Sequence, residues 1–186
     1  SAFLNWLGVG VSSSLFLSLL YGFGNKYKYQ LVHKKVAIKN LPAAFKGFKI
    51  IHISDIHSGS LKEKEAVQKG IDLIQKQGAD LILFTGDLVN DKAVEMQDWA
   101  PIFGQLSASK GVFSTLGNHD YGDYVQWPSK EAKIANLEAL KAVHASMGWK
   151  LLMNENVTIE QGGAKIKLVG IENWGAKARF PKYGQL

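Results

Sequence analysis

Residues 49–54, KIIHIS, form a short apolar run typical of a buried β-strand, and polar Asp55 and His57 follow it. The same change recurs twice further along, in ADLILFTGD at 79–87 and in GVFSTLGNHD at 111–120. Apolar residues at helical spacing occupy the intervals between these runs. This alternation of strands and helices predicts an α/β fold, in which functional residues gather where the strands end.

The remaining predicted elements follow from the same local patterns. Apolar residues at helical spacing predict three helices, at 62–77, around 99–106 and at 130–147. Two further strands, WKLLMNENVTIE and AKIKLVGIE, are predicted to pair through Gly162 and Gly163. His144 lies on the apolar face of the third helix, which predicts a packing role for it rather than a ligand role.

Side chains that can bind a metal or carry a proton follow each of the first three predicted strands. They are Asp55, His57, Asp87, Asn118, His119 and Asp120. Each motif alone is more often a turn or a helix cap. The ends of parallel strands lie side by side, however, so three such motifs would converge. Residues two apart in an extended chain share a face, so Asp55 and His57 could grip one ion. Buried carboxylates need compensating cations, and mixed Asp, His and Asn ligands suit Mn²⁺, Fe²⁺ or Zn²⁺ rather than Ca²⁺.

The order D-x-H at 55–57, G-D at 86–87 and G-N-H-D at 117–120 resembles the calcineurin-like metallophosphoesterases, over about residues 48–174. The resemblance implies a β-sandwich flanked by helices that uses two divalent metal ions to hydrolyse phosphoester bonds. The basic segment and the apolar stretch before the first motif resemble the membrane-anchored bacterial branch of that family.

The resemblance also implies roles for the motif residues. Asp55 and His57 would hold the first metal, Asp87 would bridge both metals, and Asn118 would bind the second. His119 would not be a ligand; it would stand near the scissile bond and stabilise or protonate the leaving oxygen.

The resemblance gives Asp120 a supporting role, in which it would hydrogen-bond His119 and orient its ring.

The family completes its site with later histidines, including a G-H-x-H motif, and this chain has none of them. We therefore expect residues 48–186 to be the N-terminal part of an incomplete metallophosphoesterase domain, weakly active or inactive alone.

The charge of this protein is concentrated at one end. The formal net charge is +6, yet residues 1–54 contain seven lysines and no acid, while residues 55–186 contain 15 basic and 16 acidic residues. Residues 2–24 carry no charge, and about 20 apolar residues suffice to span a bilayer. We predict a membrane helix at 1–24, with a buried amphipathic helix as the alternative.

Residues 25–47 are predicted to form a basic juxtamembrane segment that includes an edge strand. Its lysines would attract anionic lipid headgroups and favour a cytoplasmic position for the catalytic domain. The nearly neutral remainder offers no basic groove, so we expect no nucleic-acid partner. The chain has no cysteine, which excludes disulfides and thiolate ligands.

Two functions of different classes fit these patterns. The first is metal-dependent hydrolysis of a phosphoester substrate, including one at a membrane, and the second is a catalytically idle, membrane-tethered α/β domain that binds or scaffolds a partner. The segment after the third motif is rich in aromatic residues, namely Tyr121, Tyr124 and Trp127. It is predicted either to shape substrate binding or to pack as a loop before the third helix.

Overall fold

The computed structural model describes residues 27–175 and 181–185, and the chain forms two compact units, residues 1–36 and 37–186. The predicted membrane helix at 1–24 lies outside the described residues. Among the residues that are described, no helix combines the length and the apolar character needed to cross a membrane.

The basic segment does not form the edge strand predicted within residues 25–47. From residue 27 onward its described backbone contains only turns and irregular structure up to the short 3-10 helix η1 (Ala43–Phe45). Val32 and Val36 are 89% and 70% exposed. A strand needs a paired neighbour and a buried face to be stable, and these exposed side chains provide no such face.

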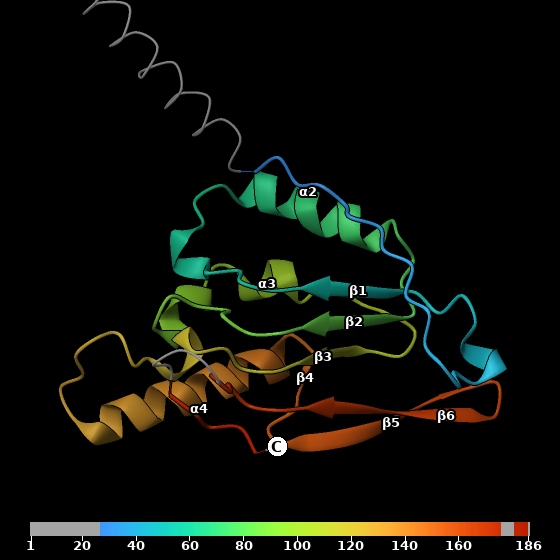
Figure 1. The fold of residues 1–186 in the computed structure, drawn as a ribbon. Helices are drawn as coiled ribbons and strands as arrows, with labels where there is room; N and C mark the ends of the chain where they lie inside the picture. Colours follow the sequence, from blue (N-terminus) through green and yellow to red (C-terminus); the bar gives the residue numbers. More distant parts are fainter. Residues whose placement is uncertain (1–26, 176–180, 186) are drawn as a thin grey trace, which may run out of the picture. The chain divides into compact units, whose positions relative to one another are not determined.

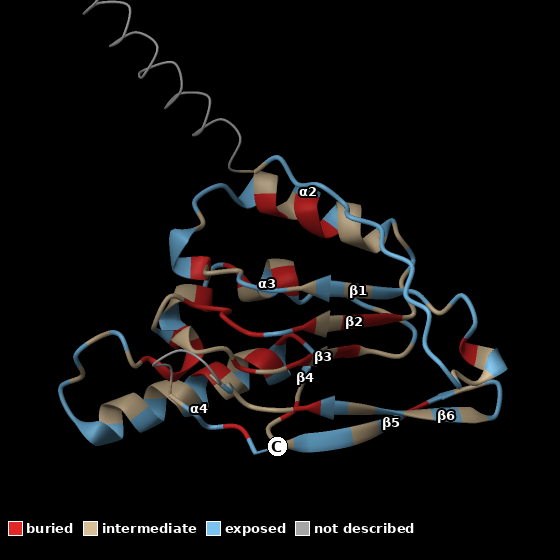
Figure 2. Ribbon diagram, in the orientation of Figure 1, coloured by how far each residue is buried: buried red, intermediate tan, exposed pale blue. Residues whose placement is uncertain are grey.

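The centre of the second unit is a parallel sheet of four strands, in the order β1 (Ile50–Ile53), β2 (Leu81–Phe84), β3 (Val112–Ser114) and β4 (Lys150–Leu151) (Figure 1). The inner strand β2 is largely buried, whereas β1 at the edge alternates exposed and half-buried side chains (Figure 2). Parallel neighbours need crossover connections, and helical segments supply them. The structure confirms the predicted α/β fold.

Helices follow the first three strands at positions close to those predicted. They are α2 (Lys64–Gln75), α3 (Ala100–Phe103) and α4 (Lys130–Ser146). Helix α4 begins after Ser129, whose hydroxyl accepts a hydrogen bond from the amide of Ala132 at 3.2 Å, a typical N-cap. Three short 3-10 helices lie in the loops: η2 (Ser58–Ser60), η3 (Ala93–Met96) and η4 (His119–Tyr121).

The end of the domain forms a two-stranded antiparallel sheet, β5 (Glu155–Gln161) and β6 (Ala164–Gly170). Gly162 and Gly163 join the strands with φ of 53° and 78°. A two-residue hairpin turn with positive φ at both positions favours glycine, which explains the pair. The predicted strand pair and its turn are confirmed.

One predicted strand is divided in two by the tertiary structure. The stretch WKLLMNENVTIE was expected to be continuous, but Lys150–Leu151 pairs with β3 in the parallel sheet, and β5 starts only at Glu155. Asn154 between them has φ of 59°, so the chain turns there and enters the second sheet. The apolar pattern is continuous across this turn, which is why the sequence alone did not reveal it.

The two sheets pack against each other through an apolar cluster around buried Phe45, Leu81 and Ile159. Side chains of β2 alternate between faces, so Leu81 points toward the hairpin while Ile82 and Phe84 point to the opposite, helix-covered side. Partly buried residues from both sheets complete the cluster: Leu41, Phe48, Leu83, Phe113, Val157, Ala164, Ile166 and Leu168. The parallel sheet therefore has one face on the hairpin and one on helices, and its strand ends remain free to build a site.

Candidate metal centre

The loops after β1 and β2 are joined by backbone hydrogen bonds. The amide of Asp55 donates to the carbonyl of Gly86 at 3.0 Å, and that of His57 donates to the carbonyl of Asp87 at 3.0 Å. Asp55, His57 and Asp87 have positive φ, at 54°, 47° and 58°. Non-glycine residues rarely adopt this conformation, and such residues cluster at functional sites. Three predicted site residues thus share one strained backbone region.

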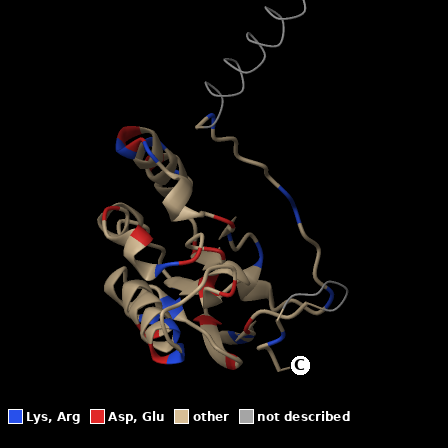
Figure 3. Cartoon of the chain, turned by 90° about the vertical axis from the view of Figure 1, so that its left-hand side faces the viewer, with Lys and Arg blue, Asp and Glu red and all other residues tan. Residues whose placement is uncertain are grey.

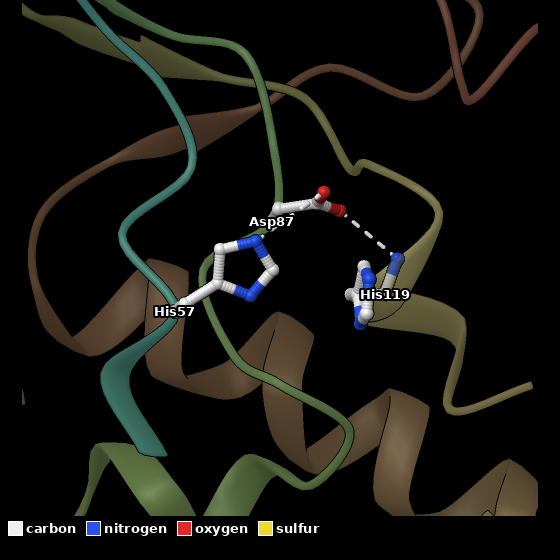
Figure 4. A group of neighbouring side chains, drawn as sticks. All are labelled: His57, Asp87 and His119. Atoms are coloured by element: carbon white, nitrogen blue, oxygen red, sulfur yellow. Dashed lines mark hydrogen bonds and ion pairs between the residues drawn. The ribbon is translucent and has the colours of Figure 1, made fainter. Parts of the chain in front are cut away.

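A compact group of possible metal ligands is formed by His57, Asp87 and His119, whose ligand atoms all lie within 4.8 Å of one another (Figure 4). The Nε2 atom of His57 lies 3.8 Å from Oδ2 of Asp87. The other oxygen, Oδ1, accepts a hydrogen bond from the backbone amide of His119 at 2.9 Å. The two rings meet edge to face with centroids 4.8 Å apart. The half-buried imidazoles and the buried carboxylate come from the ends of three strands, as the sequence predicted.

Asp55 does not join this group, and the reason lies in the backbone. Its carboxylate accepts a hydrogen bond from the hydroxyl of Ser54 and is exposed. The prediction that Asp55 and His57 share a face assumed an extended chain, and positive φ at both residues makes that assumption wrong. A role for Asp55 as a metal ligand remains a prediction.

The ring of His119 is held by a carbonyl group rather than a carboxylate. Its Nδ1 lies 2.7 Å from the carbonyl oxygen of Asn90. A carbonyl oxygen can only accept, so Nδ1 carries a hydrogen. In the neutral ring Nε2 therefore has a free lone pair, and it is the nitrogen that gains or loses a proton. This tautomer lets Nε2 either bind a cation or, when protonated, give a proton to a neighbouring oxygen.

The prediction that Asp120 orients the ring of His119 is wrong. Asp120 is fully buried, and its carboxylate accepts hydrogen bonds from backbone amides of the second and third motif loops. The donors are Asp87 at 2.8 Å, Leu88 at 2.8 Å, Val89 at 3.3 Å and Gly117 at 2.9 Å. Burial raises the pKa of Asp120 to about 6, although these amides act in the opposite direction. Asp120 therefore organises the loop that presents Asp87.

Two glycines allow the second and third motif loops to approach closely. Gly86 has φ of 99°, and a Cβ atom there would overlap the backbone of Gly117. A Cβ atom on Gly117 would overlap the carboxylate of Asp87 and lie 2.6 Å from its amide nitrogen. Both motifs therefore need their glycine so that the two loops can touch, because a side chain at either position would push the loops apart.

Glu95 is a site-supporting residue that the sequence analysis missed. Its carboxylate accepts hydrogen bonds from four backbone amides on two loops, at Gly59 (3.1 Å), Asn90 (2.7 Å), Asp91 (3.0 Å) and Lys92 (2.8 Å). It therefore fixes the loop whose carbonyl holds His119. The available signal was half of a capping box at the start of η3, in which Glu95 accepts from the amide of Lys92, but a lysine side chain cannot accept the reciprocal bond and so does not match the motif.

The strand-end group offers ligand atoms of the kind that metal-dependent enzymes use. The sequence profile of the calcineurin-like phosphoesterase family matches residues 48–183, and the chain belongs to this family. The resemblance drawn from the three motifs is thereby confirmed.

Relatives of this chain occur in bacteria and in animals. It is 24% identical over 159 residues to a transmembrane protein with a metallophosphoesterase domain from Danio rerio, covering 83% of this chain and 34% of that protein. It is 36% identical over 86 residues to the uncharacterised metallophosphoesterase YkuE of Bacillus subtilis, in a match that covers 45% of this chain and 30% of YkuE. It is also 37% identical over 90 residues to the UDP-2,3-diacylglucosamine pyrophosphatase LpxG of Chlamydia trachomatis, in a match that covers 46% of this chain and 27% of LpxG. The chain thus spans about a third of the length of these relatives.

Proposed function

We propose that the full-length protein hydrolyses phosphoester bonds with two divalent metal ions, Mn²⁺, Fe²⁺ or Zn²⁺, at the carboxyl ends of β1, β2 and β3. The observation that carries the proposal is the convergence of His57, Asp87 and His119 on one point from three strand ends. A buried carboxylate beside the imidazole of His57 is a donor pair suited to these ions, and a carboxylate so placed calls for a cation.

The ligand roles in this proposal follow the family pattern. Asp55 and His57 would hold the first ion, Asp87 would be shared by the two, and Asn118 would hold the second. When bound, the ions supply positive charge for the phosphate and activate water as the nucleophile. The position of Asp87 between His57 and the backbone of His119 supports its bridging role, because its two oxygens face different partners.

His119 has the geometry of an acid for the leaving oxygen. Its Nδ1 hydrogen is directed to the carbonyl of Asn90, which stabilises the ring when Nε2 is also protonated. Nε2 then gives its proton to the departing alkoxide and returns to the neutral form. The ring sits beside both His57 and Asp87, so a phosphate at the ligand group would lie within its reach.

The substrate we propose is a phosphoester at a membrane surface, such as a phospholipid or a nucleotide-linked lipid precursor. Support comes from the names of two relatives, one a transmembrane protein and one a pyrophosphatase that acts on a diacylated UDP-sugar. The described part of the basic segment, residues 27–47, carries five lysines and no acid (Figure 3). We propose a membrane helix at 1–24, a basic juxtamembrane segment at 25–47, and, at 48–186, the N-terminal part of a cytoplasmic metallophosphoesterase domain.

The experiment compares metal-free and reloaded protein. Full-length protein in detergent is stripped with a chelator, reloaded with Mn²⁺ or Zn²⁺, and assayed on bis(p-nitrophenyl) phosphate and on UDP-2,3-diacylglucosamine. Activity that disappears with the chelator and returns with the metal supports the proposal. A protein that binds no metal and hydrolyses neither compound would contradict it and would favour the idle binding or scaffold domain.

A further inference from the structure

The aromatic segment after the third motif divides into packing residues and one residue at the site. Tyr121 is buried and stacks on Tyr183 with ring centroids 3.7 Å apart. The indole nitrogen of Trp127 donates to the carbonyl of Gly122 at 2.7 Å. Both residues therefore hold the loop together. Tyr124 is different, because the residue is 49% exposed and its ring lies against His119 of the candidate metal centre.

Tyr124 contacts two neighbouring residues of the G-N-H-D motif. Its hydroxyl oxygen accepts a hydrogen bond from Nδ2 of Asn118 at 2.8 Å. Its ring lies against the imidazole of His119, with centroids 4.6 Å apart and planes inclined by 36°. One side chain thus touches both the proposed second-metal ligand and the proposed acid.

The contact with Asn118 matters because the two ends of a carboxamide differ. Only the oxygen, Oδ1, can bind a cation, since the NH₂ group is a donor. An unrestrained carboxamide can present either end. The hydrogen bond from Nδ2 to Tyr124 occupies the donor end of the carboxamide and leaves Oδ1 available for a cation.

The loop that carries Tyr124 is itself held in place. Gly122 ends η4 in the left-handed conformation, with φ of 64°, and a Cβ atom there would lie 2.9 Å from the ring of Trp127. The carboxylate of Asp123 accepts a hydrogen bond from the hydroxyl of Tyr183 at 2.9 Å and forms an ion pair with Lys133 of α4. Tyr124 is therefore presented by an anchored turn, which a positioning role requires.

We propose that Tyr124 is a positioning residue that turns Oδ1 of Asn118 toward the metal and restrains the ring of His119. This inference rests on the proposed function, because it assigns a task at the same site. Partners that orient a metal ligand typically contribute about 10-fold to 100-fold in metal affinity. Loss of the hydroxyl alone should therefore weaken metal binding by about 10-fold.

The test is a titration of metal-free full-length protein with Mn²⁺ alone. We compare the unmodified protein with Tyr124→Phe, which keeps the ring, and with Tyr29→Phe, a matched control at an exposed tyrosine of the basic segment that takes no part in holding the Tyr124 turn. The expected result is about 10-fold weaker Mn²⁺ binding for Tyr124→Phe and a change of less than about twofold for Tyr29→Phe.

A double-mutant cycle separates positioning from a general structural effect. In an Asn118→Ala background, Tyr124→Phe should cause no further loss of Mn²⁺ affinity, because the group that Tyr124 positions is absent. An additional loss of the same size in that background would overturn the proposal. Equal Mn²⁺ affinity of Tyr124→Phe and the unmodified protein would overturn the positioning role of Tyr124 and leave the proposed function standing. If the unmodified protein binds no Mn²⁺, both the positioning role and the proposed function are overturned.

Discussion

His119 and His144 occupy opposite chemical settings in one domain. His119 lies half-buried in the strand-end loops, where its Nδ1 meets the carbonyl of Asn90 and its ring faces His57. His144 is fully buried in α4, beside the rings of Phe84 and Trp149. Within the described chain, neither nitrogen of the His144 ring has a hydrogen-bond partner.

The difference shows that burial alone does not make a functional histidine. At the strand ends, loops with positive φ bring donors, acceptors and a carboxylate around the ring of His119. At the helix interface, apolar neighbours surround His144, and burial lowers its pKa to about 4. The first region can bind a charged group, while the second excludes charge, including a proton on its own histidine.

The largest expected effect comes from removing the central carboxylate of the first region. Asp87→Asn should lower the metal-dependent phosphodiesterase activity of the full-length protein by about 1,000-fold, because metal stabilisation of the reacting phosphate is worth several kcal/mol. The measurement is kcat/KM with Mn²⁺ present. Asp72→Asn, on the exposed surface of α2, is the matched control and should leave the rate unchanged. Full activity of the Asp87 variant would remove this site from the proposed reaction.

The next effect concerns the stability of the strand-end loops. Asp120→Ala leaves four backbone amides without their acceptor, and we expect a loss of about 3 kcal/mol in the free energy of unfolding. Chemical denaturation measures it. Asp120→Asn keeps one acceptor oxygen and should lose less. Unchanged stability together with lost activity would instead support the catalytic role first predicted for Asp120.

The third prediction concerns the apolar surroundings of His144 and the pH dependence of stability. The pKa of His144 is about 4 in the fold against 6.5 for an ordinary histidine. The unfolded chain therefore takes up the proton first, so the stabilising contribution is present above pH 6.5 and is lost as the pH falls toward 4. Between pH 7 and pH 4.5 the protein should lose about 2 kcal/mol more stability than His144→Leu. Thermal or urea denaturation at both pH values measures this difference. His33→Gln, at an exposed position, is the control, and equal pH dependence of the protein and His144→Leu would contradict the assignment.

The smallest expected effect comes from the start of the helix that carries His144. Ser129→Ala removes the N-cap acceptor of α4 and should cost about 1 kcal/mol of stability. Ser129→Asp keeps an acceptor and should restore most of it. Neither variant should change Mn²⁺ affinity, which denaturation and metal titration can establish side by side. A clear change in metal affinity would show that the two regions are coupled.

The sequence by itself determined the elements and their polar ends. Short apolar runs identified β1, β2 and β3, helical spacing identified α2 and α4, and Gly162 with Gly163 identified the hairpin turn. The three motifs placed His57, Asp87 and His119 at neighbouring strand ends, because parallel strands align their carboxyl ends whatever the loops do. These features depend on local periodicity and on turn chemistry, which a sequence contains directly.

Only the tertiary structure decided which partners these residues have. Asp120 bonds amides more than 30 positions away rather than the adjacent His119, and Asn90 supplies the carbonyl that His119 needs. The turn at Asn154 divides an apolar run between two sheets, and positive φ turns Asp55 away from its predicted partner. Such pairings arise when distant loops pack together, and the free energy of satisfying buried polar groups, rather than sequence neighbourhood, selects them.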